Sequence, residues 1–218
     1  MGKFFAASLL FLISMNVTAQ NRILIVGDSI SAGFGLDNGE EWAALLQKKL
    51  QEEQLNYQVV NASISGDTTA GGLARIEKLL VENKPQWVLI ELGANDGLRG
   101  LSPKEMKKNL AQSILLSQKM GAKVLLLEVK IPPNYGKRYL DEFSAVYSQL
   151  STELDVPFVP SIMEDVALHK ELMQKDLLHP NALAQPLLLN KIWQTLKSML
   201  YSNTFAKIKV VAGENSRL

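Results

Sequence analysis

Cysteine is absent from this 218-residue chain, and histidine occurs only at His169 and His179. Without cysteine there can be no disulfide framework, no thiolate nucleophile and no thiolate-ligated zinc or iron–sulfur site. Two distant histidines leave only scattered carboxylates as further ligands, so we expect no metal site. Any mechanism that needs a base titrating near neutral pH must use one of these two imidazoles.

The chain also lacks an excess of charge of either sign. Its 23 Lys and Arg against 22 Asp and Glu give a formal net charge of +1. This balance supplies no positive field to hold a polyanion, so we expect no nucleic-acid partner. Apolar residues make up 47% and charged residues 21% of the chain, which is typical of a packed core. At this length the composition predicts one compact domain.

The apolar run at the N-terminus, residues 4–13, is about ten residues long, whereas a bilayer-spanning helix needs roughly 20. Lys3 precedes this run, and Val17-Thr18-Ala19 follows it with residues of the kind that signal peptidase requires. We therefore predict a signal peptide over residues 1–19 and a single periplasmic or secreted domain over 20–218. An uncleaved anchor is the weaker alternative. No cysteine follows to accept a lipid, so we expect no stable membrane insertion after cleavage.

Five short apolar runs alternate with segments of helical periodicity. The predicted strands are residues 22–26, 57–61, 87–92, 123–129 and 157–159. The predicted helices are residues 40–54, 68–82, 103–120, 140–154 and 182–199. Because the strands are not joined by hairpin signals, the pattern predicts an α/β fold with three α/β/α layers around a doubly wound, parallel, five-stranded sheet.

Two further segments are less regular. Residues 164–174 are charged and amphipathic, and they predict an exposed helix that carries His169. Residues 200–218 form a C-terminal extension of unknown role, in which residues 208–211 have the composition of a strand.

Four polar loops follow the predicted strands, over residues 27–31, 62–67, 93–97 and 176–181. Ligands of open parallel sheets bind where the carboxyl ends of the strands gather, so these loops should meet at one edge. Ser29 comes directly after a buried strand and a glycine, where a hydroxyl can project from that edge. An isolated serine in this setting would more often cap the next element, so its assignment depends on a base that reaches it.

His179 is the better candidate for that base, because Asp176 stands three positions earlier. In a helical turn this separation puts two side chains on the same side. Asp176 would then accept the Nδ1 proton and stabilise the imidazolium that forms when Ser29 attacks. Alone, the pair would more often cap the final helix. We therefore interpret the three residues jointly as a catalytic triad of nucleophile, base and orienting carboxylate.

Three groups in the loops are candidates for stabilising an oxyanion: the backbone N–H groups of Ser29 and Gly66 and the side-chain amide of Asn95. In isolation, Gly66 would be a turn glycine and Asn95 the first residue of an Asx turn. Asp28 and Asp96 flank these positions, and we interpret both as organisers of the loops. The G-x-S-x-G, dinucleotide and G-K-[ST] patterns are missing, so neither the usual nucleophile elbow nor a nucleotide site is supported.

Together the four loops resemble the sequence blocks of the SGNH, or GDSL, hydrolase family. The matching stretches are Gly-Asp-Ser-Ile-Ser-Ala-Gly-Phe-Gly (27–35), Ser-Ile-Ser-Gly-Asp-Thr (63–68), Glu-Leu-Gly-Ala-Asn-Asp-Gly-Leu-Arg-Gly (91–100), Ile-Pro-Pro-Asn-Tyr-Gly (131–136) and His-Pro-Asn-Ala-Leu-Ala-Gln-Pro (179–186). The resemblance extends over roughly residues 22–199. It implies a flavodoxin-like sheet, the same triad and the same oxyanion hole.

The resemblance also implies a mobile loop near residues 98–102 that closes over an acyl chain. The sequence places apolar residues at that edge, and the predicted substrate-binding residues are Leu98, Leu101, Ile131, Pro132 and Tyr135. Ala94 stands where the family's near relatives carry glycine, and the segment beyond about residue 200 has no counterpart in them.

The expected function is that of an exported serine hydrolase that cleaves fatty acyl esters and thioesters, of the acyl-CoA thioesterase, lysophospholipase or arylesterase type. Its partner would be a small acyl ester or thioester, with no cofactor and no obligatory oligomer. One alternative is a short-chain carbohydrate or aryl esterase that uses the same triad. Another is a noncatalytic lipid or glycan carrier.

Overall fold

The computed structural model of the chain describes residues 21–214, so the predicted signal peptide lies outside the described residues. The strands are β1 (Asn21–Gly27), β2 (Tyr57–Asn61), β3 (Trp87–Glu91), β4 (Lys123–Leu127) and β5 (Phe158–Val159). The α-helices are α1 (Ser29–Ala32), α2 (Trp42–Glu52), α3 (Thr69–Asn83), α4 (Ala94–Leu98), α5 (Pro103–Lys119), α6 (Lys137–Leu154) and α7 (Gln185–Glu214). The 3₁₀ helices are η1 (Pro133–Tyr135), η2 (Lys170–Leu172) and η3 (Ala182–Ala184). Each predicted strand is present within a few residues of its expected bounds.

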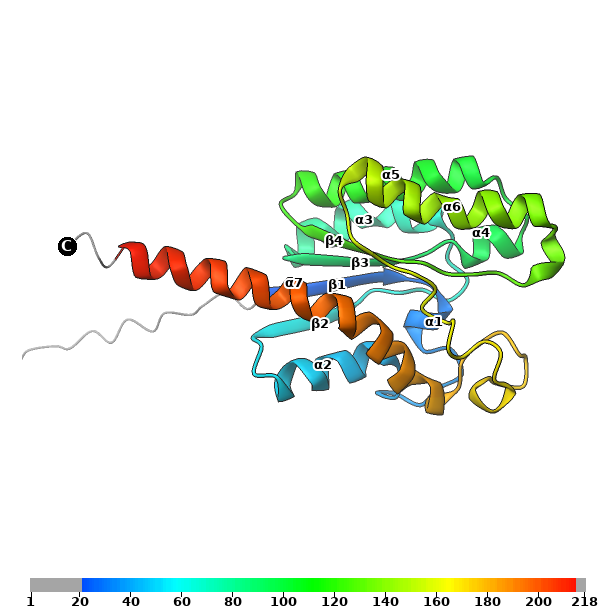
Figure 1. The fold of residues 1–218 in the computed structure, drawn as a ribbon, viewed down its shortest axis with the longest axis horizontal. Coiled ribbons are helices and arrows are strands. Elements are labelled where there is room, and N and C mark those ends of the chain that lie inside the picture. The colour runs from blue at the N-terminus through cyan, green and yellow to red at the C-terminus, as the bar shows by residue number, and fades with distance from the viewer. Residues whose placement is uncertain (1–20, 215–218) are drawn as a thin grey trace, which may run out of the picture.

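The sheet has the order β2-β1-β3-β4-β5, and every neighbouring pair is parallel. Figure 1 shows α2 and α7 on one face and α3, α5 and α6 on the other. Alternate residues of β1 enter the two cores: Ile23 and Ile25 pack on the α2 and α7 side, and Leu24 and Val26 pack on the opposite side. The predicted three-layer, doubly wound fold is confirmed.

Local sequence explains where the covering helices begin and end. The Thr68 side chain caps α3 by accepting a hydrogen bond from the backbone N–H of Gly71. Lys84 ends the same helix with a φ of 44°, directly before a proline. Pro103 occupies the first turn of α5, where a missing backbone N–H costs no helical hydrogen bond, and the Ser102 side chain before it makes no capping hydrogen bond.

The C-terminal helix is longer than the sequence pattern predicts. Helix α7 is continuous from Gln185 to Glu214, and Figure 1 shows its later turns extending beyond the sheet. The strand-like interpretation of residues 208–211 is therefore wrong. The first half of the helix is held by fully buried residues, namely Leu188, Ile192, Leu196 and Leu200. Once a helix is nucleated in this way, each further residue adds a hydrogen bond, whereas an isolated strand segment has no ladder partner.

The segment before that helix is also different from its prediction. Residues 162–168 form successive turns, and η2 is the only helical part of the range 164–174. Val166 and Met173 are buried, whereas Leu168 is almost completely exposed, so the apolar residues do not share the single face that a helix needs. Among the helices within residues 21–214, none has both the length and the apolar character that crossing a bilayer requires.

Candidate active site

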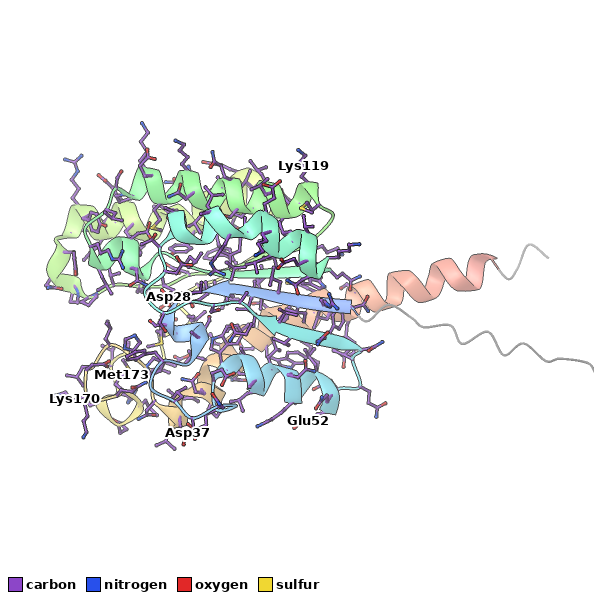
Figure 2. All side chains as sticks on the ribbon, turned by 180° about the vertical axis from the view of Figure 1, so that it is seen from behind. Asp28, Asp37, Glu52, Lys119, Lys170 and Met173 are labelled. Carbon is purple, nitrogen blue, oxygen red and sulfur yellow. The ribbon has the colours of Figure 1, made fainter. Side chains whose placement is uncertain are left out.

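The site begins where β1 ends. The Asp28 carboxylate accepts a hydrogen bond from the backbone N–H of Ile30 at 3.0 Å, which starts the four-residue helix α1. Figure 2 shows Asp28 at the carboxyl end of β1, on the same side of the molecule as the loop that carries Lys170 and Met173. Ser29, the first residue of α1, is thereby placed at this edge with its Oγ 2.8 Å from Nε2 of His179. The two residues are 150 positions apart in the sequence.

The other ring nitrogen of His179 meets Asp176. Its Nδ1 lies 2.7 Å from Oδ2 of Asp176, while Oδ1 accepts hydrogen bonds from the backbone N–H groups of Leu178 and His179. These contacts, first the backbone hydrogen bond of His179 and then its imidazole, lower the pKa of Asp176 to about 2. The carboxylate is therefore ionised at neutral pH and assigns the ring proton to Nδ1. Nε2 is left to accept the proton of the Ser29 hydroxyl.

The backbone between Asp176 and His179 is not the helical turn that their spacing predicts. Residues 175–179 form a turn and a bend, and Leu177 has a left-handed φ of 55°. The Asp176 side chain closes this turn through its backbone hydrogen bonds, in the manner of an Asx turn. The juxtaposition of Asp176 and His179 therefore comes from local side-chain-to-backbone bonding.

Other residues hold His179 in place. The ring of Phe34 lies 4.6 Å, centroid to centroid, from the ring of His179. Gln174 donates from its side chain to the carbonyl oxygens of Phe34 and Pro180, and its backbone N–H donates to the carbonyl of His179. These bonds join the loop of His179 to the segment that follows α1.

His169 does not take part in this arrangement. It is exposed and pairs with Glu171, with its Nδ1 3.2 Å from the Glu171 carboxylate. It does not border the cavity next to Ser29. The choice of His179 over His169 agrees with this geometry.

The candidate oxyanion groups converge on the same cavity. Gly66 and Asn95 both border it, together with Ser29. Gly66 has a φ of 82°, and no heavy atom lies within 4 Å of the position that a Cβ would occupy, so glycine is favoured here by backbone conformation rather than by space. The Nδ2 atom of Asn95 lies 3.2 Å from the Asp28 carboxylate and 3.0 Å from the carbonyl oxygen of Asp67. A bound oxyanion would replace or share one of these two acceptors.

Two buried carboxyl groups lie beneath this edge. Asp28 is 1% exposed, and Glu91, the last residue of β3, is fully buried. Burial raises the pKa of Asp28 to about 6 and raises that of Glu91 well above its usual value, with the charge of Asp28 adding to the shift of Glu91. Sequence reasoning missed Glu91; its only signal was a charged residue at the end of an apolar strand.

Asp96 also organises a loop, as expected. Its carboxylate accepts hydrogen bonds from the backbone N–H and the hydroxyl of Thr69, at 2.8 and 2.6 Å. These bonds join the start of α4 to the start of α3.

A cavity of about 780 Å³ opens next to Ser29 and His179. Of the predicted substrate-binding residues, Leu98, Ile131 and Pro132 border it, but Leu101 and Tyr135 do not. The Tyr135 hydroxyl instead donates to the carbonyl oxygen of Leu98 at 2.8 Å. Leu101 is 44% exposed, and its carbonyl accepts a hydrogen bond from the Tyr139 hydroxyl. Both residues therefore take part in tethering the segment of residues 98–101, and neither borders the cavity in this structure.

One part of the cavity lining was not predicted. It is formed by Phe34, Met163, Ala167, Leu168, Met173, Leu177 and Leu178. Most of these residues belong to the turns between β5 and His179, which have no helical or strand periodicity to mark them. Ala94 borders the cavity beside Asn95.

Among the side chains that the structure describes, those of residues 21–202, no three His, Asp or Glu gather in a group that would hold a metal ion. The site is thus an arrangement of a hydroxyl, an imidazole and a carboxylate beside an apolar cavity. Such a relay removes a proton from the hydroxyl as it attacks a carbonyl carbon.

Comparison with known proteins places this geometry in context. Esterase TesA of Pseudomonas aeruginosa is 51% identical over 191 residues, which is 88% of this chain and 94% of that protein. Thioesterase 1/protease 1/lysophospholipase L1 of Escherichia coli K12 is 43% identical over 191 residues, covering 88% of this chain and 90% of the relative. A crystal structure of TesA superposes with a TM-score of 0.80 at 52% identity, covering 82% of this chain and 99% of that one.

A family model agrees with these pairwise similarities. The model of the GDSL-like lipase/acylhydrolase family matches residues 25–185, a range that contains the loops of Ser29, Gly66, Asn95 and His179. From the sheet order, the hydroxyl–imidazole–carboxylate contact and this match, we conclude that the chain belongs to the GDSL-like lipase/acylhydrolase family.

Proposed function

We propose that this protein is an exported serine hydrolase that cleaves fatty acyl esters and thioesters through an acyl-enzyme on Ser29. The observation that carries the proposal is the hydrogen-bonded series from Ser29 Oγ to His179 (2.8 Å) and from His179 to Asp176 (2.7 Å) at the mouth of an apolar cavity. The names of the two relatives, an esterase and a thioesterase with lysophospholipase activity, support the same class of reaction.

In the proposed reaction, Ser29 Oγ attacks the acyl carbonyl carbon while its proton passes to Nε2 of His179. Asp176 stabilises the resulting imidazolium, and the N–H groups of Ser29 and Gly66 with the amide of Asn95 stabilise the oxyanion. Collapse of this intermediate expels the alcohol or thiol, which takes the proton from His179. Water, deprotonated by the same imidazole, then attacks the acyl-enzyme, and the acid leaves as Ser29 regains its proton.

The shape and lining of the cavity favour an acyl chain over an acetyl group. A volume of about 780 Å³ far exceeds what two carbons need, and most of its lining residues are apolar. Each methylene taken out of water contributes about 0.8 kcal/mol of binding free energy. A short-chain carbohydrate or aryl esterase would gain little binding free energy from such a cavity. That function is the alternative that chain-length profiling tests.

We also propose that residues 1–19 are a cleaved signal peptide, which would place the enzyme in the periplasm or outside the cell. This rests on the sequence pattern of Lys3, the apolar residues 4–13 and Val17-Thr18-Ala19. Determination of the N-terminus of the exported protein tests it: a mature chain that begins at Gln20 supports cleavage, and one that retains Met1 contradicts it.

Two assays test the activity. Wild-type protein should react with a fluorophosphonate probe and hydrolyse p-nitrophenyl esters, with a preference for chains well above two carbons. Ser29→Ala should lose both reactions, whereas His169→Ala, which changes the exposed histidine, should retain both. Labelling that persists in Ser29→Ala would contradict the proposed nucleophile. An acetate preference would favour the short-chain esterase, and a wild-type protein that neither labels nor turns over would favour the carrier.

A further inference from the structure

Glu91 lies directly behind the turn that presents Ser29. Its Oε2 atom accepts a hydrogen bond from the Ser31 hydroxyl at 2.7 Å and lies 3.4 Å from the backbone nitrogen of Asp28. These two donors flank Ser29 in the sequence, so one side chain contacts the turn on both sides of the nucleophile. A Cβ at Gly27 would lie 2.7 Å from the Ser31 Oγ and 2.9 Å from the Glu91 Oε2, which shows how closely this cluster is packed.

The surroundings of Glu91 favour a neutral carboxyl group. The residue is fully buried, its Oε1 atom has no hydrogen-bond partner, and among the side chains of residues 21–202 no ion pair to it is found. A buried carboxylate without a compensating charge is strongly disfavoured, and the neighbouring Asp28 adds like-charge repulsion. The interaction with the Glu91 side chain lowers the pKa of Asp28, against the larger effect of burial.

Asp28 extends these contacts to the oxyanion hole. Its carboxylate accepts hydrogen bonds from the backbone N–H of Ile30 and from the side-chain amide of Asn95. Glu91 therefore contacts the nucleophile turn directly and contacts Asn95 through Asp28. Glu91 is not the nucleophile, the base or an oxyanion donor of the proposed reaction, so it does not need to contact the substrate.

We propose that Glu91 is a positioning residue for this active site, which fixes the Ser29 turn through Ser31 and fixes the Asn95 amide through Asp28. The inference rests on the proposed function, because it assigns Ser29 and Asn95 their roles in acyl transfer. Glu91 should therefore contribute to stabilisation of the transition state, because the oxyanion hole stabilises charge that develops only as the carbonyl is attacked. Substrate binding in the apolar cavity should be unaffected, because Glu91 does not border it.

Three variants test the proposal in the full-length protein. Glu91→Gln keeps a side-chain oxygen that can accept from the Ser31 hydroxyl and the Asp28 backbone N–H, so its kcat should stay within about threefold of wild type. Glu91→Met has a similar length but no such acceptor. Its kcat should fall at least about tenfold with KM within threefold, a fraction of the effect of losing an oxyanion donor. Tyr147→Phe is the matched control, because it removes a buried hydrogen bond to the carbonyl of Leu92 next to Glu91 without contacting Asp28.

Rates are expressed per active site, titrated with a phosphonate inhibitor, so that unfolded protein does not count. The proposal requires a lower kcat in Glu91→Met, recovery in Glu91→Gln and an unchanged kcat in Tyr147→Phe. Equal kcat values in Glu91→Met and wild type, or an equal loss in Tyr147→Phe, would overturn it, because both results indicate a role in stability alone.

A milder variant covers the case in which Glu91→Met does not fold. Ser31→Ala deletes the hydroxyl that bonds to Glu91, and we expect a threefold or greater loss of kcat with little change in KM; an unchanged kcat would overturn the proposal. Ser117→Ala is its control, since Ser117 is equally buried but its hydroxyl donates to the carbonyl oxygen of Ser113 within α5. Ser29→Ala, assayed in parallel, separates the two proposals. If it stays active, the proposed function fails; if it is inactive while Glu91→Met keeps full kcat, only the role of Glu91 fails.

Discussion

Ser29 and His179 are held by two regions of different character. Ser29 lies at the end of the central strand between Asp28 and Ser31, which are 1% and 0% exposed. His179 lies in a loop, and the side chain of its partner Asp176 is 41% exposed. The first region is built from the sheet and its buried carboxyls, and the second is built from turns that the side chains of Asp176 and Gln174 hold together.

This contrast separates the energetic roles of the two regions. Substitutions on the Ser29 side disturb buried polar groups and should lower both stability and activity. Side chains on the His179 side are partly exposed to solvent, so their substitution should lower activity with little effect on the free energy of unfolding. Each prediction below tests one side of this division.

The largest effect is expected on the His179 side. Asp176→Asn keeps the shape of the side chain but removes the negative charge that orients and stabilises the imidazole, and kcat should fall by about 10³ to 10⁴. The thermal midpoint should change by only a few degrees, because Asp176 is partly exposed. Glu171→Gln is the control, since it changes the carboxylate of the other, exposed histidine pair and should leave kcat unchanged. A large loss of stability in Asp176→Asn would break the division between the two regions.

On the Ser29 side, Asn95→Ala should lower kcat by about 10² to 10³, the usual result of losing one oxyanion donor. It should also destabilise the protein by about 1 to 3 kcal/mol, because Asp28 and the Asp67 carbonyl lose a hydrogen-bond donor. Kinetics and urea unfolding on the same preparation measure both. Asn83→Ala, at the far end of α3, removes a comparable amide and should retain full activity. An unaltered kcat in Asn95→Ala would show that Asn95 is not an oxyanion donor.

A smaller effect is expected at the unpredicted wall of the cavity. Leu168 is 90% exposed yet borders the cavity, so Leu168→Asp should leave stability unchanged. It should lower kcat/KM for long-chain esters about threefold to tenfold relative to short-chain ones, since roughly one to two methylenes lose an apolar contact. Leu115→Asp, a half-exposed position on α5, is the control. An equal decline for every chain length would mean that this wall does not contact the acyl chain.

The smallest effect concerns stability as a function of pH. The pKa of Asp28 is raised to about 6 in the folded protein, and that of Glu91 is raised well above its usual value. The folded state therefore binds more protons than the unfolded state above about pH 4, and these groups reduce stability as the pH rises from about 4 past 6. Glu91→Gln has no carboxyl group to titrate, so it avoids the loss of stability that Glu91 causes as the pH rises. The difference between its thermal midpoint and that of wild type should therefore become about 2 to 6 °C more positive from pH 4.5 to pH 7.5. A difference that is constant with pH would contradict the assigned protonation.

Much of this architecture follows from local sequence patterns. The five apolar runs predict the strands because residues buried on both faces of a parallel sheet are continuously hydrophobic. Ser29, Gly66 and Asn95 could be brought together in advance because each follows a strand, and the carboxyl ends of parallel strands share an edge. Asp176 and His179 could be paired from their spacing, although the backbone that joins them is a turn with Leu177 in a left-handed conformation.

The remaining features depend on contacts that have no local signature. Met163 and Leu168 border the cavity from turns, where apolar residues follow no period that would reveal which way they face. The hydroxyl of Tyr135 donates a hydrogen bond to the backbone carbonyl of Leu98. Whether this side chain faces the cavity or the loop depends on tertiary packing, which the local sequence does not reveal. The partners of Glu91 lie 60 and 63 positions away in the sequence, so its role is visible only in the folded structure.

The distance along the chain between Ser29 and His179 has a consequence for biosynthesis. The hydroxyl belongs to the first strand–helix connection, and the imidazole precedes the last helix by a few residues. At ribosomal rates of about 5–20 residues per second, the 150 intervening positions take roughly 8 to 30 seconds to emerge. Throughout that interval the nascent polypeptide carries Ser29 without His179, so the proposed hydrolytic activity can arise only after residue 179 has been synthesised.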